Sequence, residues 1–395
     1  MSVKIPDIEK KERFSPVSLS REMLETALHE ALLKVDFAIE SMNGAFPSAA
    51  STNNVYQPTE NNGSWIAGFW TGILWHAYEL SGNPKYKSVA LSHIPSYTKR
   101  IKERLGVDHH DMGFLYTPSC VAAWKICADE QGRAAALMAA DNLCSRYQKR
   151  GGFIQAWGAL DDPTKYRLIV DCLLNIPLLY WAAEETGDKS YAEMAFTHFN
   201  TTADVCWRPD AGTYHTYYFD YETGKPAYGA TKQGASDDSS WARGQTWGIT
   251  GPILTYAYKK SERAMRYFKA SANYFLNRLP LDFIPYWDLI FGDGDGEPRD
   301  SSSAAIAICG LLEGVRHMDE SDPLRAVYYN AACRMMSSLI EGYTTRELKE
   351  ANGLLLHGTY TRPSGNGVDE MNIWGDYFYM EALHRMLDPE WKMYW

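Results

Sequence analysis

The chain has 395 residues, 45% of them hydrophobic and 22% charged, which is enough for a large buried core without disulfide or metal cross-links. It contains no apolar run of about 18 residues, the length of a membrane-spanning helix, and the charged segment 1–16 lacks the apolar centre of a secretion signal. Its 39 basic and 49 acidic residues are interspersed, which excludes a nucleic-acid-binding surface. We therefore expect a cytoplasmic or periplasmic protein that binds neither nucleic acids nor membranes.

The cysteines and the aromatic residues bear on the compartment and on the kind of ligand. None of the seven cysteines belongs to a Cys-x-x-Cys pair and most lie in apolar stretches, so we interpret them as small core residues, which favours a reducing compartment. The 13 Trp, 26 Tyr and 14 Phe residues offer flat faces on which sugar rings can pack. A large core would use the same residues, so composition alone does not separate the two roles.

Apolar residues recur with the helical period along most of the chain. Turn and cap residues separate these stretches: Ser81–Pro84 ends one helix and starts the next, and Thr186–Asp188 and Ser321–Pro323 do the same. The pattern predicts helices over Ser20–Met42, Trp65–Leu80, Pro84–Leu105, Pro118–Glu130, Arg133–Lys149, Tyr166–Thr186, Lys189–Val205, Ser240–Lys259, Glu262–Arg278, Ser302–Met318, Pro323–Glu341 and Ile373–Met386.

The predicted helices are of two kinds. Trp65–Leu80, Tyr166–Thr186 and Ser302–Met318 are apolar on nearly all sides, whereas Pro84–Leu105 and Lys189–Val205 carry charges on one face. Buried helices that alternate with half-exposed ones indicate two concentric rings, built from about six antiparallel hairpins. We therefore predict an all-α fold, an (α/α)6 barrel, with short strands in the loops at the active-site face.

The segments between the helices contain no Pro-, Gly- or Ser-rich linker. Residues 1–395 are therefore predicted to form one catalytic domain, with 1–19 as an N-terminal extension. Two segments, Thr213–Tyr218 and Gly353–Tyr360, break the helical period and are predicted to be short strands.

Polar residues at 108–111 lie directly before an aromatic run, which is typical of the mouth of a helical barrel. Asp111 is a candidate catalytic carboxylate there. A metal site made by Asp108, His109, His110 and Asp111 is the alternative. It is not favoured, because four consecutive side chains cannot all reach one ion and no His-x₃-His pair supports them.

Asp171 is the strongest candidate for a catalytic acid. The segment around it, 167–182, is apolar apart from Asn175, which lies one helical turn further on. A carboxylate in such surroundings is costly unless it is hydrogen-bonded or lines a cavity. Burial raises the pKa of a carboxyl group, as a general acid at neutral pH requires, although a structural Asp that caps a neighbouring loop would give the same pattern.

A third candidate cluster lies within 233–248. Arg243 and Trp247 are four residues apart and therefore share a helix face, where an Arg can bind a carboxylate and a Trp can support a sugar ring. The alternative is a helix start capped by Ser239 or Ser240, with an internal salt bridge.

Three more ring-bearing residues lie where they could contact a sugar. Trp65 and Trp157 are near the starts of predicted inner segments, and His215 could donate a hydrogen bond from its predicted strand. A structural role would explain each of them equally well. The chain has no Gly-rich phosphate loop and no Gly-x-Ser-x-Gly elbow, so kinase, Rossmann and α/β-hydrolase chemistry are not expected.

Five segments carry a family likeness: 62–72 (NGSWIAGFWTG), 109–114 (HHDMGF), 167–181, 239–248 (SSWARGQTWG) and 372–378 (NIWGDYF). In this order, from about residue 60 to 390, the chain resembles glycoside hydrolase family 88, the unsaturated glucuronyl hydrolases. The resemblance implies an (α/α)6 barrel without metal or cofactor. It also implies substrates, namely polysaccharide-lyase products with 4-deoxy-L-threo-hex-4-enuronic acid at the non-reducing end, and a reaction that hydrates their C4=C5 vinyl ether.

The resemblance also implies roles for individual residues. Asp171 matches the residue that protonates C4 and orients the attacking water, and Asp111 matches the second essential carboxylate. Trp157 matches the wall of the subsite next to the unsaturated ring. The expected substrate-binding residues are Trp65, His110, Trp157, His215, Gln233, Arg243, Trp247, Tyr360 and Ser364.

One segment departs from the family pattern. Members that prefer sulfated substrates carry Ser and Lys residues after the strand that corresponds to Gly353–Tyr360. Here Ser364 can be matched, but Asn366 stands where the Lys is expected, and Arg362 could substitute as a cation. The preference for sulfate and the parent polysaccharide therefore stay open.

Alternative functions stay open as well, including an inverting hydrolase of saturated glycans or an epimerase on the same barrel. An unsaturated rhamnogalacturonyl hydrolase of the related family 105 would have the same barrel and chemistry but would act on pectin fragments. A non-catalytic sugar-binding barrel would keep the aromatic residues and would not need the buried Asp171. The expected partner in the leading hypothesis is an unsaturated oligosaccharide, and the protein is expected to be a monomer or a homodimer.

Overall fold

The computed structural model describes residues 3–395, which are mostly helical. The helices are α1 (Arg21–Met42), α2 (Ala67–Ser81), α3 (Pro84–Lys102), α4 (Met112–Tyr116), α5 (Ala122–Cys127), α6 (Glu130–Cys144), α7 (Pro177–Thr186), α8 (Lys189–Val205), α9 (Ala242–Lys259), α10 (Glu262–Leu276), α11 (Ser301–His317), α12 (Pro323–Gly342) and α13 (Ile373–Leu387). All the strands are short.

The strands form small antiparallel sheets. β1 (Phe46–Pro47) pairs with β2 (Pro58–Thr59), β3 (Tyr147–Gln148) with β4 (Phe153–Ile154), and β8 (Gly358–Thr361) with β9 (Asn366–Glu370), while β5 (Arg167–Ile169), β6 (Thr216–Phe219) and β7 (Pro226–Ala230) form one sheet in that order. Both predicted strands are therefore present, each with later bounds than expected and each paired with a strand that the sequence did not indicate.

The predicted breaks between helices are confirmed. Gly82 ends α2 in the left-handed region with φ of +69°, and the Asn83 side chain then accepts a hydrogen bond from the Lys85 N–H at the start of α3. Gly187, with φ of +77°, and Asp188 do the same between α7 and α8. These cap residues satisfy backbone groups that a helix end otherwise leaves without partners.

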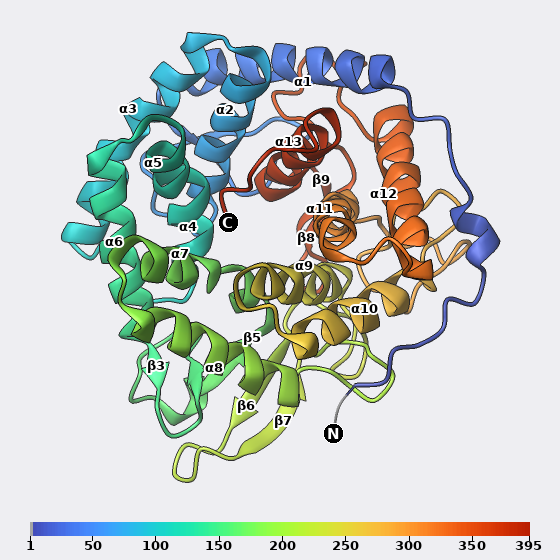
Figure 1. Ribbon diagram of the computed structural model, residues 1–395. Helices are drawn as coiled ribbons and strands as arrows, with labels where there is room; N and C mark the ends of the chain where they lie inside the picture. Colours follow the sequence, from blue (N-terminus) through green and yellow to red (C-terminus); the bar gives the residue numbers. More distant parts are fainter. Residues whose placement is uncertain (1–2) are drawn as a thin grey trace.

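The helices differ in their position and burial as predicted. Figure 1 shows α3, α6, α8, α10 and α12 around the outside of the molecule, and α2, α9, α11 and α13 closer to its centre. In α2 every residue from Ala67 to Ala77 is buried, and in α9 every residue from Ala242 to Thr255. The outer helix α3 has buried residues along one side only. The inner helices therefore contribute buried residues on all their sides to the main hydrophobic core.

Two predicted helices were wrong in part. Tyr166–Thr186 begins instead as strand β5, continues as a 3-10 turn over Val170–Leu174 and becomes helical only at Pro177. Pro177 has no N–H and fits the first turn of a helix, and β5 is held by β6, far along the chain. The predicted helix at Pro118–Glu130 is divided, because α4 precedes Pro118 and a π-helical turn over Thr117–Val121 precedes α5.

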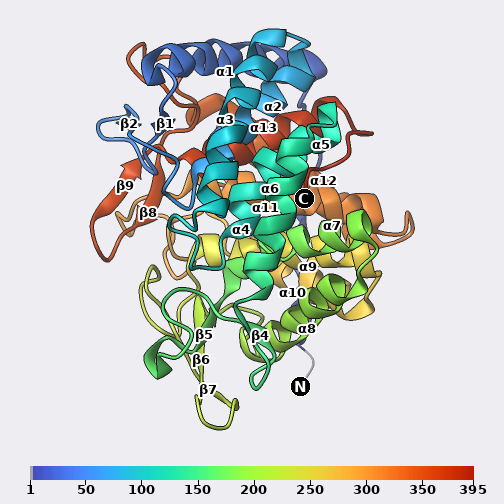
Figure 2. The ribbon, with the colours of Figure 1, turned by 90° about the vertical axis from the view of Figure 1, so that its left-hand side faces the viewer.

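The strands gather at one end of the helices. Figure 2 shows β1, β2, β5–β7, β8 and β9 towards its left side, and the C-terminus towards the other side. The N-terminal extension crosses the outside of α10 and α12 (Figure 1), where the Asn273 side chain donates to the Pro6 carbonyl and the Asn330 side chain to the Phe14 carbonyl. The strand-bearing end is the one at which the candidate residues meet.

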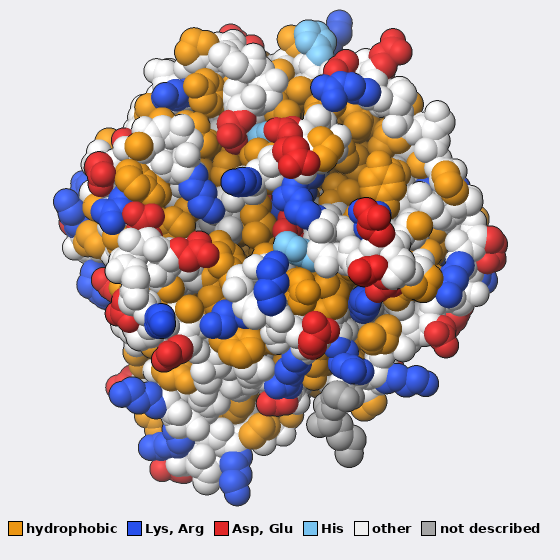
Figure 3. All heavy atoms as spheres, viewed as in Figure 1, with side chains coloured by type: hydrophobic (Ala, Val, Ile, Leu, Met, Phe, Trp, Pro, Cys, Tyr) orange, Lys and Arg blue, Asp and Glu red, His pale blue; other side chains and the backbone are white. Residues whose placement is uncertain are grey.

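The surface and the cysteines agree with the composition. Acidic and basic side chains are interspersed over the face shown in Figure 3. All seven cysteines are unpaired, five of them buried and the other two, Cys127 and Cys144, partly buried. Within residues 3–395 no helix is long and apolar enough to cross a membrane.

Candidate active site

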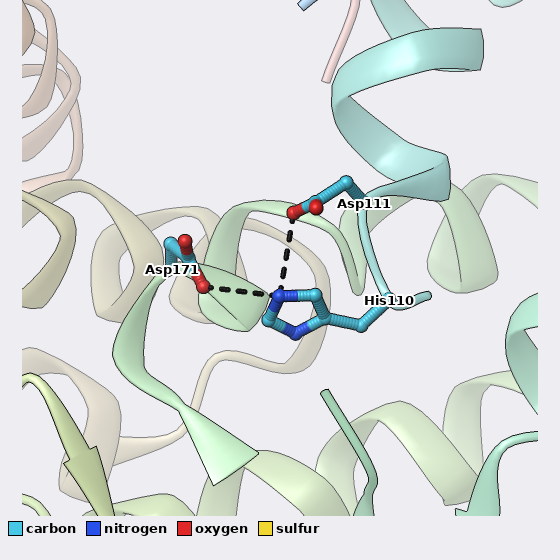
Figure 4. Close-up of side chains that lie close together, drawn as sticks. All are labelled: His110, Asp111 and Asp171. Carbon is cyan, nitrogen blue, oxygen red and sulfur yellow. Dashed lines mark ion pairs between the residues drawn. The ribbon is translucent and has the colours of Figure 1, made fainter. Parts of the chain in front are cut away.

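His110, Asp111 and Asp171 form the centre of the site (Figure 4). His110 Nε2 lies 3.3 Å from Asp111 Oδ1 and 3.4 Å from Asp171 Oδ1. Asp111 immediately precedes α4 and makes no side-chain cap bond to that helix, so its carboxylate is free to face the other two groups. Asp171 enters from the 3-10 turn after β5, and its side chain is 18% exposed. The site is thus buried but opens to solvent at Asp171.

Two residues, Asn175 and Gly113, allow α4 to approach the turn that carries Asp171. Asn175 accepts a hydrogen bond from Phe114 N at 2.8 Å, and its amide lies 3.4 Å from Asp111 Oδ1 and 3.3 Å from the Asp171 carbonyl. Gly113 permits the contact, because a Cβ at this position would lie 2.3 Å from the Asn175 Cα. Asn175 therefore ties the two carboxylate-bearing segments together.

His109 holds Asp111 from the other side. Its Nε2 lies 2.9 Å from the Gly106 carbonyl oxygen, and its Nδ1 lies 3.1 Å from the Asp111 backbone nitrogen and 3.3 Å from Asp111 Oδ2. Its ring stacks on Trp157, with centroids 4.2 Å apart and planes inclined by 8°. Trp157 is 40% exposed, so it offers an accessible aromatic surface beside His109.

The pKa values of the two carboxyl groups are shifted in opposite directions. Burial, together with the nearby Asp111 charge, raises the pKa of Asp171 well above its ordinary value, with Arg243 opposing the shift. Burial would also raise the pKa of Asp111, but His110, His109 and Asn175 together lower it. Burial lowers the pKa of His110 to about 4, so this ring is neutral at pH 7. Asp171 is thus shifted towards its protonated form beside Asp111, which is shifted towards its ionised form, as expected of an acid and its electrostatic partner.

The metal site suggested by consecutive residues does not form as such. Asp108 is exposed and paired with Arg104, and His109 is directed at the Gly106 carbonyl. Instead, ligand atoms of His110, Asp111 and Asp171 lie within 4.8 Å of one another, a spacing that a metal ion can bridge. The four consecutive side chains therefore do not converge on one point, as the sequence argument held, and two of them instead meet a third side chain from a distant segment.

Arg243 is committed to protein partners. Its Nη1 donates to Asp300 Oδ2 at 3.0 Å and to the Thr359 carbonyl, and its Nη2 donates to Gln233 Oε1 at 2.7 Å and to the Tyr360 carbonyl. Arg243 and Asp300 are both buried, and the ion pair joins α9 to the start of α11 and to β8. The expected internal salt bridge is therefore confirmed. The cap expected from Ser239 or Ser240 is wrong, because α9 begins directly after Trp241 and has no side-chain cap.

Aromatic rings surround this arginine and extend to Trp65. The Arg243 guanidinium lies 4.3 Å from the ring centroid of Trp241 and 4.9 Å from that of Trp374. Trp65 stacks on Trp374 at 5.4 Å and donates from its indole N–H to the Tyr360 hydroxyl at 3.0 Å. Trp65 and Tyr360 are both partly exposed, so they form a wall of the site.

The remaining predicted residues lie at different depths. His215 Nδ1 accepts from Lys232 N at 2.9 Å, which leaves the proton on Nε2, and burial lowers the pKa of His215 to about 3. Trp247 is buried against Phe114 and Phe378 and lies within the core. Ser364 lies in the exposed turn between β8 and β9 and bonds only to Thr361 among the described residues.

Several contributors could not be singled out from the sequence. Asp300 is separated from Arg243 by 57 positions, and Trp374 lies still further along the chain. Trp241 was inside a quoted motif without a role, and His109 was considered only as a metal ligand. Only Asp300 has a local sequence signal, because it directly precedes three serines at the start of α11. It accepts hydrogen bonds from two of them, Ser302 and Ser303.

Comparisons with known proteins agree with this geometry. The model of Glycosyl Hydrolase Family 88 matches residues 38–388. The unsaturated chondroitin disaccharide hydrolase of Streptococcus pneumoniae is 48% identical over 394 residues, which cover 100% of this chain and 99% of that protein. The crystal structure of unsaturated glucuronyl hydrolase from Streptococcus agalactiae superimposes with a TM-score of 0.97 at 48% identity, covering 100% of this chain and 99% of the other. A mutant of that enzyme complexed with dGlcA-GalNAc6S gives a TM-score of 0.90 at 44% identity, with the same coverage.

Proposed function

The chain belongs to glycoside hydrolase family 88, and we propose that it removes the terminal unsaturated uronic acid from the oligosaccharides that polysaccharide lyases release. It is an unsaturated glucuronyl hydrolase that acts on unsaturated glycosaminoglycan disaccharides. The membership sets aside the family 105 alternative. The observation that supports the chemistry best is the raised pKa of Asp171 beside Asp111, whose own pKa is lowered.

The first step is the transfer of a proton to carbon. The C4=C5 double bond of the substrate is a vinyl ether, because C5 also bears the ring oxygen. Asp171 gives its proton to C4, a C4–H bond forms from the π electrons, and positive charge develops over C5 and the ring oxygen. The carboxylate left on Asp171 and the charge on Asp111 both stabilise that positive charge at close range.

Water completes the reaction. Its oxygen bonds to C5 while Asp171 accepts one of its protons, so the carboxylic acid is regenerated and C5 becomes a hemiketal. The hemiketal opens to a ketone at C5 and leaves a hemiacetal at C1, which releases the neighbouring sugar with its oxygen. One water molecule is consumed, and no nucleophile of the protein attacks C1, in contrast to the usual pair of carboxyl groups in glycosidases.

The other predicted residues divide into contacts and supports. We assign Trp65 and Tyr360 to the wall around the unsaturated ring and Trp157 to the next subsite, because these rings are partly exposed around the catalytic pair. We assign His215 and His110 to contacts with ring substituents. The Nε2 proton of His215 has no partner among residues 3–395, and His110 makes no side-chain hydrogen bond there, although its Nε2 lies close to both carboxyl groups.

Arg243 and the residues around it are assigned to supporting the wall of the site, without contact to the substrate. Arg243 holds Gln233 and the Tyr360 backbone in place and contributes a positive charge, while buried Trp247 supports Phe114 next to Asp111. Ser364 lies on an exposed turn at the rim of the site. There it could contact only a longer or sulfated substrate. The site needs no metal or cofactor for protonation of C4 or for addition of water.

The fold assigned with this function is an (α/α)6 barrel in one domain. The inner position of α2, α9, α11 and α13, with outer helices around them, supports six concentric hairpins. Residues 1–395 would then form one catalytic domain whose N-terminal extension covers α10 and α12. The strand-bearing end would be the mouth of the barrel.

The test measures the conjugated C=C–COO⁻ absorbance of an unsaturated glycosaminoglycan disaccharide over time. The wild type removes this absorbance, and in D₂O the product carries one deuterium at C4. Asp171→Asn abolishes the loss while thermal unfolding stays close to that of the wild type. Asp162→Asn, in an exposed turn of the same segment, is the matched control and keeps its activity. Near-wild-type turnover by Asp171→Asn would refute the role of this residue.

A further inference from the structure

One face of β5 is accessible to solvent, and the strand leads into the turn that carries the catalytic acid. Along residues 166–171 burial alternates: Tyr166, Leu168 and Val170 are buried, whereas Arg167, Ile169 and Asp171 are partly exposed. Alternate residues of a strand point to the same side. Arg167 and Ile169 therefore share the accessible side of β5, and Asp171, which is also partly exposed, follows in the 3-10 turn that begins at Val170.

The Arg167 guanidinium is a cation without a partner. Among residues 3–395 its side chain makes no ion pair or hydrogen bond, and its Nε is buried without an acceptor. The charge of Arg167 helps to lower the pKa of Asp162. That carboxylate, however, already accepts hydrogen bonds from the backbone N–H and the hydroxyl of Thr164 at 2.8 Å and 2.7 Å. A partly buried guanidinium with unused donors is costly unless a ligand supplies the acceptor.

Aromatic rings hold this cation in place. Arg167 lies opposite Tyr218, which lies opposite Tyr228 in the sheet, so the three side chains share one face. The guanidinium is 5.6 Å from the centroid of the Tyr218 ring, and Tyr218 stacks on Tyr228 with centroids 4.9 Å apart. Tyr228 is 58% exposed, so this face remains open to a ligand.

Arg167 is also on the side of the departing sugar. Its carbonyl accepts a hydrogen bond from Ala156 N at 3.0 Å, which places it beside Trp157, the proposed wall of the second subsite. Its charge reaches the catalytic centre, because it contributes to the lowered pKa values of His110 and His215. Arg167 thus lies beyond the unsaturated ring, within range of the saturated sugars attached to that ring.

We propose that Arg167, backed by Tyr218, binds an oxyanion on the saturated part of the substrate, either a sulfate ester on the second sugar or the carboxylate of a later uronic acid. The inference rests on the proposed function and adds a determinant of substrate class to it. A planar guanidinium suits both groups, since each presents two oxygens to a fork of N–H donors. Arg362, by contrast, already has a carboxylate partner in Glu297 at 3.3 Å.

The test compares three substrates: an unsulfated unsaturated disaccharide, the same disaccharide with a sulfate on its hexosamine, and an unsulfated unsaturated tetrasaccharide. Arg167→Gln is expected to raise KM about tenfold for one or both of the last two, with kcat preserved, because one charge-assisted contact is lost. The unsulfated disaccharide keeps its KM. Arg167→Lys restores part of the loss. Lys225→Gln, which removes an exposed cation in the turn between β6 and β7, is the control and leaves all three KM values unchanged.

The pattern of the loss identifies the anion. An effect confined to the sulfated disaccharide assigns the sulfate, and an effect confined to the tetrasaccharide assigns the later carboxylate. An equal effect on all three substrates overturns the proposal, because Arg167 would then act on the unsaturated ring that they share, and so does no effect on any. If the wild type turns over none of them, the proposed function fails, and the affinities of wild type and Arg167→Gln for the same sugars still decide the role of Arg167.

Discussion

Replacing Asp111 by Asn removes a negative charge beside the Asp171 carboxyl and keeps the shape of the side chain. Ligand atoms of the two residues lie within 4.8 Å of each other. At an effective dielectric constant of about 20, two unit charges at that distance interact by about 3.5 kcal/mol, which corresponds to roughly 2.5 pKa units. The pKa of Asp171 is therefore expected to fall by about that amount in Asp111→Asn.

The pH dependence of kcat/KM reports this shift. Activity requires a protonated Asp171, so it is lost as pH rises through the pKa of that residue, and a lower pKa moves this basic limb towards acid. The limb of Asp111→Asn should lie about 2.5 pH units below that of the wild type, whatever the maximum rate. Asp108→Asn is the control, because Asp108 is 72% exposed and paired with Arg104, and its limb should not move. A limb of Asp111→Asn that coincides with the wild type, or lies at higher pH, would refute the electrostatic role of Asp111.

The remaining predictions concern the supports of the site and its need for metal. Arg243→Ala should lower the free energy of unfolding by about 3–5 kcal/mol in denaturant titrations, because it leaves buried Asp300 without its cation; a loss of activity with unchanged stability would argue for direct substrate binding instead. Gly113→Ala should reduce the yield of folded protein or cost at least about 2 kcal/mol, since its Cβ would meet the Asn175 backbone at 2.3 Å, and wild-type stability would show that the contact relaxes freely. Prolonged treatment with a chelator should leave kcat unchanged, and loss of activity that Zn²⁺ or Ca²⁺ restores would show that the central cluster holds an ion.

The sequence predicted the elements whose determinants are local. The cap residues at Gly82–Asn83 and Gly187–Asp188 define helix ends within a few positions, and they are confirmed. The apolar surroundings of Asp171 were also visible, because burial there results from its immediate neighbours. A raised pKa for this residue was therefore predictable before its partners were known.

The sequence did not predict features that depend on distant segments. Strand β5 was predicted as helix, since its apolar residues fit either period and its pairing with Thr216–Phe219 is set by the tertiary fold. Strand β9, Asn366–Glu370, is polar and contains a glycine, so nothing local marks it as a strand. The Arg243–Asp300 pair likewise needs the fold to bring α9 against the start of α11.

The central claim is that Asp171 carries a proton at neutral pH. Infrared difference spectra between the wild type and Asp171→Asn measure this directly, because a protonated carboxyl and a carboxylate absorb at well-separated frequencies. The account predicts that at pH 7 the wild type shows the C=O band of a protonated carboxyl, that the band is missing in Asp171→Asn, and that it shifts in D₂O. A difference spectrum with carboxylate bands only would contradict the account.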